Sequence, residues 1–128
     1  MSRRVLDASA LLALLNGEVG AERVLAALEE GAIISAVNLA EVVGKLADVG
    51  LSESETRGVL GPLALAVADF DEDSAYAAGL LRPLTVRQGL SLGDRACLGL
   101  ALALGLPALT AERSWTQLSH PVAVETIR

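Results

Sequence analysis

Hydrophobic residues along the 128-residue chain form short apolar runs that alternate with longer segments, in which apolar residues recur at helical spacing. The short runs are typical of buried strands, and the longer segments indicate helices with one buried face. Asn16-Gly17, Gly31 and Gly50 are stop signals that separate successive elements. We expect strands near residues 4–6, 32–35, 64–69, 107–110 and 122–125, and helical segments at 8–15, 19–30, 38–49, from 52, 71–84, 91–104 and 114–118.

Strands that alternate with helices favour an α/β fold in which helices cover both faces of a parallel sheet. In such sheets, ligands bind outside the carboxyl ends of the strands. The chain has no internal repeat, low-complexity tract or linker, so we expect a single domain over residues 1–128.

The apolar content is high, with 52% hydrophobic residues and a mean hydropathy of +0.50, yet only Phe70, Tyr76 and Trp115 are aromatic. The longest uncharged run, residues 96–111, contains Pro107 and is shorter than the roughly 20 apolar residues of a bilayer span. We therefore predict a buried helix followed by a buried strand, and no membrane segment. We expect no signal peptide, because Asp7 interrupts the first apolar stretch.

Charge and cysteine content narrow the class of protein further. Sixteen acidic residues against ten basic ones give a net charge of -6, so the overall field does not attract nucleic acid. Nucleic-acid chemistry would therefore need local basic groups or a bound metal ion. The lone Cys97 excludes an internal disulfide and fits a reducing cytoplasm, where we expect the protein to reside.

Acidic residues recur near the points where predicted strands meet helices: Asp7, Glu41, Asp94 and Glu112. The carboxyl ends of parallel strands share one edge of the sheet, so these carboxylates could converge there. Hydroxyl residues accompany them in the sequence: Ser9, Ser35 and Thr110. Clustered oxygen ligands suit Mg²⁺ or Mn²⁺, and such ions activate water and stabilise charge on a phosphodiester.

Helix capping is the competing interpretation of the same residues. The segments Asn38–Glu41 and Ser91–Asp94 both have the form of a capping box, and Asp7 and Thr110 are common N-cap residues. Capping does not explain why acids recur at one edge, and a capping residue can also bind a metal. On spacing alone, the metal site and the set of helix caps remain equal alternatives.

Four blocks of sequence resemble a PIN domain, and more narrowly a VapC-type toxin of bacterial toxin–antitoxin pairs. The blocks are Val5–Leu15, Ser35–Val42, Leu90–Leu98 and Ala108–Trp115. They follow the family order and the resemblance covers essentially the whole chain, the first and third blocks being the most specific. It implies a PIN-like three-layer α/β/α sandwich with a central, mostly parallel sheet of about five strands.

The resemblance also implies an activity: metal-dependent hydrolysis of RNA phosphodiester bonds by an endoribonuclease toxin. The implied catalytic and metal-binding acids, for Mg²⁺ or Mn²⁺, are Asp7, Glu41, Asp94 and Glu112, with Ser9 and Thr110 as polar neighbours. Metal-activated water would attack the phosphodiester in line, without a covalent enzyme intermediate.

Two positions depart from the family pattern. Glu112 stands where the family usually has Asp, which puts a second metal ion in doubt, and Asn38 replaces a common hydroxyl residue. A catalytically weak PIN-like module that binds RNA or protein is therefore the alternative function.

The resemblance implies partners as well as a substrate. They are an RNA substrate, a cognate VapB-type antitoxin, a second copy of the chain in a homodimer, and operator DNA through the antitoxin only, with no membrane partner. Our candidate phosphate contacts are Arg95, Arg113, Arg82 and Arg87. The first two directly follow proposed metal ligands, and the other two precede the helix that begins near Ser91.

Two other enzyme and signalling classes have partial matches. Gly89–Gly93 fits the G-x-S-x-G pattern of serine hydrolases, with Ser91 as nucleophile and His120 later in the chain. That motif requires a buried strand before the serine, whereas the preceding residues are polar and charged. A receiver domain would need a lysine at the end of the last strand, but the only lysine, Lys45, falls in a predicted helix.

Overall fold

The computed structural model describes residues 3–118 and 120–128. Its centre is a parallel five-stranded sheet with the order β3-β2-β1-β4-β5. The strands are β1 (Arg4–Leu6), β2 (Ala32–Ser35), β3 (Ala66–Ala68), β4 (Ala108–Thr110) and β5 (Val124–Thr126). All five predicted strands are confirmed: β1 and β2 have the expected bounds, and those of the other three shift by one or two residues.

Helices connect the strands in the predicted alternation. They are α1 (Ala8–Leu15), α2 (Ala21–Glu30), α3 (Ala36–Asp48), α4 (Glu53–Leu60), α5 (Glu72–Leu80), α6 (Arg82–Thr85) and α7 (Leu92–Leu104), with 3₁₀ turns η1 (Gly61–Leu63), η2 (Val86–Gln88) and η3 (Arg113–Gln117). Within the described residues, none of these helices has the length and apolar character that a bilayer span requires.

Two predicted helix bounds were wrong for local reasons. The helix expected over 71–84 is divided at Leu81 into α5 and α6. Pro83 lies in the first turn of α6, and because proline lacks a backbone N–H it cannot donate the hydrogen bond that would continue α5. Helix α3 begins at Ala36, before the predicted start at Asn38. The Ser35 hydroxyl accepts a hydrogen bond from the Val37 N–H and caps the helix there. The predicted capping box of Asn38 and Glu41 therefore does not form.

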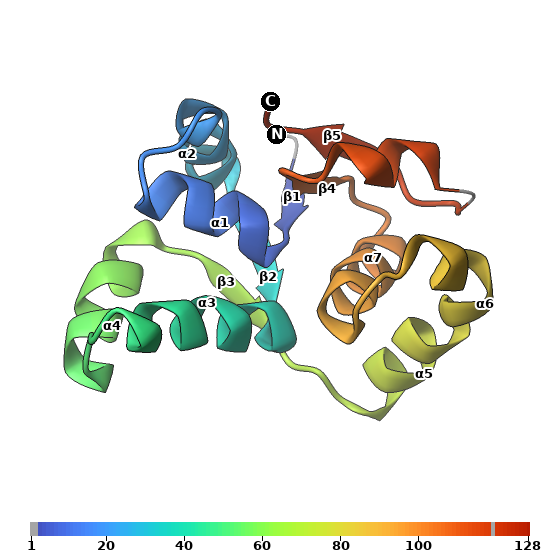
Figure 1. Ribbon diagram of the computed structural model, residues 1–128, viewed down its shortest axis with the longest axis horizontal. Coiled ribbons are helices and arrows are strands. Elements are labelled where there is room, and N and C mark those ends of the chain that lie inside the picture. The colour runs from blue at the N-terminus through green and yellow to red at the C-terminus, as the bar shows by residue number, and fades with distance from the viewer. Residues whose placement is uncertain (1–2, 119) are drawn as a thin grey trace.

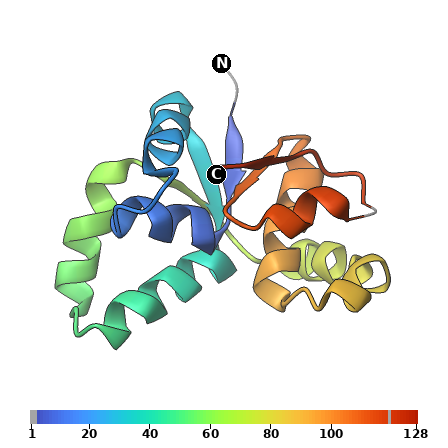
Figure 2. The same cartoon turned by 45° about the horizontal axis from the view of Figure 1, so that its top comes forward.

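Side chains of the central strands alternate between two cores. Val5 and Ala108 pack with residues of α7, whereas Leu6 and Leu109 pack with residues of α1 and α2. Figure 1 shows helices α1–α4 on one side of the sheet and α5–α7 on the other, and the turned view in Figure 2 keeps this division. The three-layer α/β/α sandwich is thus confirmed.

The strand order reverses direction between β1 and β4. From β1 the chain moves outward through β2 to β3, and it then returns to place β4 on the other side of β1, followed by β5. Such a switch point leaves a crevice outside the carboxyl ends of the two strands, where ligands bind in open α/β sheets. Asp7 follows β1 directly, and Thr110 ends β4.

Candidate active site

Asp7 is buried at this switch point, with only 3% of its surface exposed. It is the N-cap of α1, and its Oδ1 accepts a hydrogen bond from the Ala10 N–H at 2.9 Å. The Ser9 hydroxyl lies 2.8 and 2.9 Å from the two carboxylate oxygens, and the Thr110 hydroxyl donates to Oδ2 at 2.7 Å. The prediction of Asp7 as an N-cap is confirmed, and both predicted polar neighbours contact it.

Burial controls the ionisation of Asp7. Its pKa is raised from 3.8 to about 6 in total, mainly by desolvation and to a smaller extent by the nearby charge of Asp94. Hydrogen bonds from Thr110, Ala10 and Ser9 offset part of this rise. The site therefore holds a negative charge near neutral pH at a cost, and a cation bound there would relieve that cost.

Thr110 and Ser9 join the ends of β1 and β4. The Thr110 hydroxyl, with no exposed surface, accepts from the Glu112 N–H at 3.0 Å while it donates to Asp7. The Ser9 hydroxyl accepts from the Ala111 N–H at 3.0 Å. Thr110 is not an N-cap, contrary to expectation, since it lies within β4 and η3 begins after Glu112.

Asp94 lies in the first turn of α7, where it forms the predicted capping box with Ser91. Its Oδ2 accepts from the Ser91 N–H at 2.9 Å, and its own N–H donates to the Ser91 hydroxyl at 3.1 Å. The residues before Ser91 form η2 and a short turn instead of a strand. The serine hydrolase alternative thus lacks the strand that its nucleophile requires.

Glu41 reaches α7 from the second turn of α3. Its Oε1 accepts from the Asn38 Nδ2 at 2.9 Å, and the same amide nitrogen donates to the Gly93 carbonyl at 2.9 Å. A Cβ at position 93 would overlap the Glu41 carboxylate, so this carboxylate lies against the residue that precedes Asp94. Sequence reasoning missed the roles of Asn38 and Gly93, because the contact spans 55 positions.

Three of the acids lie close enough to Cys97 to affect its pKa. This thiol is fully buried in α7, and its pKa is raised first by burial and then by the charges of Asp7, Asp94 and Glu41. Glu112 is exposed at the start of η3. The structure thus brings three predicted acids around the start of α7, with Glu112 linked to them through Thr110.

The chemistry of this group of oxygen ligands suits a hard divalent cation. Asp7 and Asp94 are engaged in capping bonds and Glu41 in its bond to Asn38, and among the described residues no three His, Cys, Asp or Glu side chains are arranged to hold one ion. The buried Asn38 Oδ1 has no hydrogen-bond partner within that same part of the chain. The residues fit a cation in kind, and their side chains would have to turn to bind it.

The candidate phosphate-binding arginines occupy different environments. Arg95 Nη1 donates to the Ala78 carbonyl at 3.1 Å and thereby joins α7 to α5. Arg113 Nε donates to the Arg128 carbonyl at 2.9 Å. Arg82 and Arg87 are exposed on α6 and η2.

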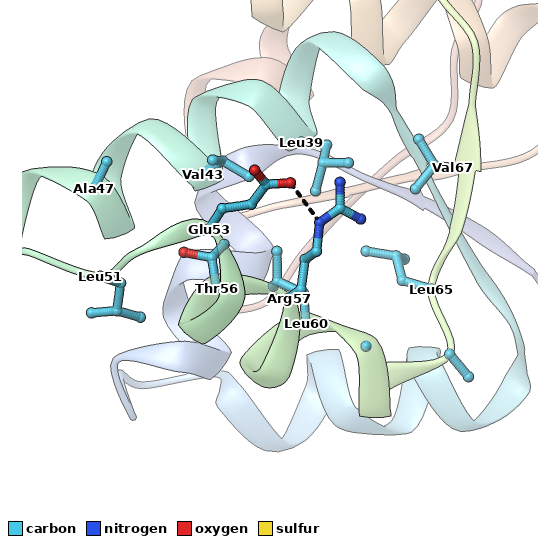
Figure 3. A pocket seen from close by; sticks show the side chains of 12 residues that line it. Leu39, Val43, Ala47, Leu51, Glu53, Thr56, Arg57, Leu60, Leu65 and Val67 are labelled. Carbon is cyan, nitrogen blue, oxygen red and sulfur yellow. Dashed lines mark hydrogen bonds and ion pairs between the residues drawn. The ribbon is translucent and has the colours of Figure 1, made fainter.

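A separate apolar groove lies between α3 and the segment from α4 to β3, and it has a volume of about 600 Å³ (Figure 3). Leucine and valine side chains form most of its wall, and the ion pair between Arg57 Nε and Glu53 Oε2, at 2.8 Å, lies across it. None of the four predicted acids lines this groove. The groove is therefore distinct from the acidic site.

Comparisons with known proteins identify the family and the fold. The family model of the PIN domain matches residues 4–121, and comparison with curated proteins finds no match. The chain is similar to DNA-bound VapBC from Salmonella typhimurium, with 22% identity, a TM-score of 0.76 and 100% of each chain covered.

Two further solved structures have the same fold. One is VapBC2 from Rickettsia felis bound to a fragment of promoter DNA, with 19% identity, a TM-score of 0.73, and 96% of this chain and 97% of the other covered. The other is VapBC-1 from nontypeable Haemophilus influenzae, with 18% identity, a TM-score of 0.73 and 97% of each chain covered. Since the family model spans residues 4–121 of 128, the chain belongs to the PIN domain family.

Proposed function

We propose that this chain is a metal-dependent endoribonuclease, acting as one PIN domain over residues 1–128 and as the toxin of a VapC-type toxin–antitoxin module. The observation that carries this proposal is the gathering of Asp7, Glu41 and Asp94 around the start of α7, at the switch point of the sheet. Buried or oriented carboxylates at this edge are suited to bind a divalent cation next to a phosphodiester.

In this proposal Asp7, Glu41 and Asp94 hold one Mg²⁺ or Mn²⁺, directly or through water. Glu112 helps to hold a second ion or a water molecule; its backbone N–H donates to the same Thr110 hydroxyl that contacts Asp7. When bound, such an ion supplies a nucleophilic water and stabilises the charge that develops on the phosphate.

The polar neighbours orient Asp7 for this role. Thr110 and Ser9 each donate to the carboxylate, and the Ala10 N–H fixes Oδ1. With a pKa of about 6, the Asp7 carboxyl is largely ionised at neutral pH, so it can bind a cation without first losing a proton.

RNA approaches this site despite the net charge of -6. We assign phosphate contacts to Arg82, Arg87 and Arg113, which are exposed. Arg95 is included with them, although its guanidinium also supports the packing of α7 on α5. Binding that depends on a few local cations is weak and sensitive to salt.

The partners we propose follow from the solved relatives. VapBC chains with the same fold occur in complexes with DNA, in one of them a promoter fragment. We infer a VapB-type antitoxin that covers the acidic site and carries the contacts to operator DNA, and a homodimer of the toxin. The lone, buried Cys97 is compatible with a reducing cytoplasm, which we propose as its compartment.

One observation favours a second function, a PIN-like module that binds RNA or protein with weak catalysis. Glu112 replaces the usual aspartate and is exposed, and the described carboxylates are not arranged around a common ion. Growth arrest on expression distinguishes the two functions, because a toxin arrests growth and its Asp94→Ala variant does not.

The direct test is cleavage of total RNA by the purified protein, followed by sequencing of the RNA ends. We expect cleavage with Mg²⁺ or Mn²⁺, none with EDTA, and a loss of more than about 100-fold in Asp7→Asn and Asp94→Asn. Cleavage that persists in EDTA or in both variants would show that another mechanism, or a contaminant, is responsible.

A further inference from the structure

Asn38 is a polar side chain in the core, with 1% of its surface exposed. Its Nδ2 donates two hydrogen bonds, one to Glu41 Oε1 and one to the Gly93 carbonyl. Its Oδ1 is buried without a partner among the described residues. One amide group thus ties the first turn of α3 to the first turn of α7 and leaves an acceptor unsatisfied.

Stability alone does not account for this arrangement. An unsatisfied buried acceptor destabilises a protein, and an apolar side chain of similar size would fill the same space without that cost. Glu41 is exposed, so water could solvate its carboxylate without help from Asn38. The bond from the Asn38 amide therefore restricts the orientation of an acid that would otherwise be free to rotate.

Gly93 completes the restriction from the other side. The Glu41 carboxylate occupies the space where a Cβ of residue 93 would lie. Because Gly93 is in the first turn of α7 and precedes Asp94, the absence of this side chain lets the Glu41 carboxylate lie against the turn that carries Asp94.

We propose that Asn38 and Gly93 are positioning residues that hold the Glu41 carboxylate beside Asp94 for cation binding. This inference rests on the proposed metal-dependent function and deepens it. Neither residue is a metal ligand in the proposal: Asn38 acts by donating to Glu41, and Gly93 acts by leaving space for it. Hydrogen-bonding partners of metal ligands commonly change metal affinity by about 10–100-fold.

The test measures Mn²⁺ binding to the full chain by calorimetry without RNA, together with the melting temperature. Asn38→Leu removes the amide and keeps the branched shape of the side chain. Gly93→Ala displaces only the flexible end of Glu41, so α7 should still form. We expect each variant to bind Mn²⁺ about tenfold more weakly than the wild type and to keep a cooperative melting transition.

Two controls separate positioning from a general effect. Gly44→Ala lies in α3 where a Cβ meets open space, and it should leave Mn²⁺ affinity unchanged. On a Glu41→Ala background, Asn38→Leu should cause no further loss of affinity, because its effect passes through Glu41.

The inference is overturned if Asn38→Leu and Gly93→Ala both bind Mn²⁺ as tightly as the wild type. It is also overturned if Asn38→Leu lowers Mn²⁺ affinity as much on the Glu41→Ala background as in the wild type. A wild-type protein that binds Mn²⁺ with these dependences but cleaves no RNA supports the positioning roles and overturns the nuclease assignment. A wild-type protein that binds no Mn²⁺ overturns both.

Discussion

Asp7 keeps a carboxylate where solvent hardly reaches it, and this burial links its charge to protein stability. Its pKa is about 6 in the folded protein, against an ordinary value of 3.8. The folded state therefore binds the Asp7 proton more tightly than the unfolded state does. Stability from this residue is fully present below the ordinary pKa and is lost as the pH rises through about 6.

The Asp7→Asn variant tests this linkage in EDTA. We expect its free energy of unfolding to exceed that of the wild type by about 1–3 kcal/mol near pH 7.5, because a buried charge is removed while a carbonyl oxygen remains for the Ala10 N–H. The gain should shrink towards about pH 4, where Asp7 is protonated in the folded state. Urea unfolding at several pH values measures this gain, with the exposed Asp48→Asn as the control. A gain that does not depend on pH would contradict the linkage to Asp7 ionisation.

Thr110 is the second residue whose role at this site has a measurable consequence. Thr110→Val keeps the side-chain shape but removes the donor to Asp7 and the acceptor for the Glu112 N–H. We expect a loss of about 1–3 kcal/mol in the free energy of unfolding and a further rise in the pKa of Asp7. Thr110→Ser retains the hydroxyl and should keep most of the stability, so equal losses in both variants would indicate packing instead.

At the scale of elements, local sequence predicts the parts of the site that depend on local contacts. Asp7 and the pair Ser91–Asp94 cap helices through residues within three positions, and the sequence predicts both. Asn38 has the same local signature with Glu41, but Ser35 at the end of β2 caps α3 instead. Position 38 thereby becomes a buried first-turn residue.

The remaining site contacts depend on the fold and have no local signal. Thr110 reaches Asp7 across 103 positions, and these contacts form only after the sheet brings β1 and β4 together. The central strands β1, β2 and β4 were predictable because their apolar runs are largely buried, as expected inside a parallel sheet, whereas the edge strands β3 and β5 are partly exposed. The five predicted strands and their common carboxyl edge therefore gave the position of the site, but they did not predict the hydrogen bonds within it.

Two capping boxes allow a matched comparison between helices. Ser91 caps α7 beside Asp94, and Ser52 caps α4 in the same way through Glu55, outside the group of acids. We expect Ser91→Ala and Ser52→Ala each to lower the free energy of unfolding by about 1 kcal/mol. Only Ser91→Ala should also reduce RNA cleavage, since it loosens the turn that carries Asp94. Equal RNA cleavage by the two variants would show that the Ser91 cap does not contribute to catalysis.

Over the whole molecule, charge is distributed unevenly between the two ends of the sheet. Arg4, which begins β1, forms ion pairs with Glu30 and Glu125, and Arg23 also pairs with Glu125. Glu30, which precedes β2, and Glu125, within β5, are thus compensated by arginine. The acids that follow the carboxyl ends are held by uncharged donors such as Ser9, Thr110 and Asn38, which leaves their negative charge available to a cation.

This asymmetry predicts that RNA binding depends on where negative charge is removed. Two double variants each change the net charge from -6 to -4. The site pair combines Asp7→Asn with Asp94→Asn, and the control pair combines Glu29→Gln with the exposed Asp48→Asn. In EDTA, we expect the site pair to bind single-stranded RNA about tenfold more tightly than the control pair, because the removed charges lie at the binding edge. With Mn²⁺, the control pair and the wild type should gain affinity while the site pair does not. Fluorescence anisotropy with a labelled RNA measures both effects, and equal binding by the two double variants would assign RNA binding to the overall charge of the protein.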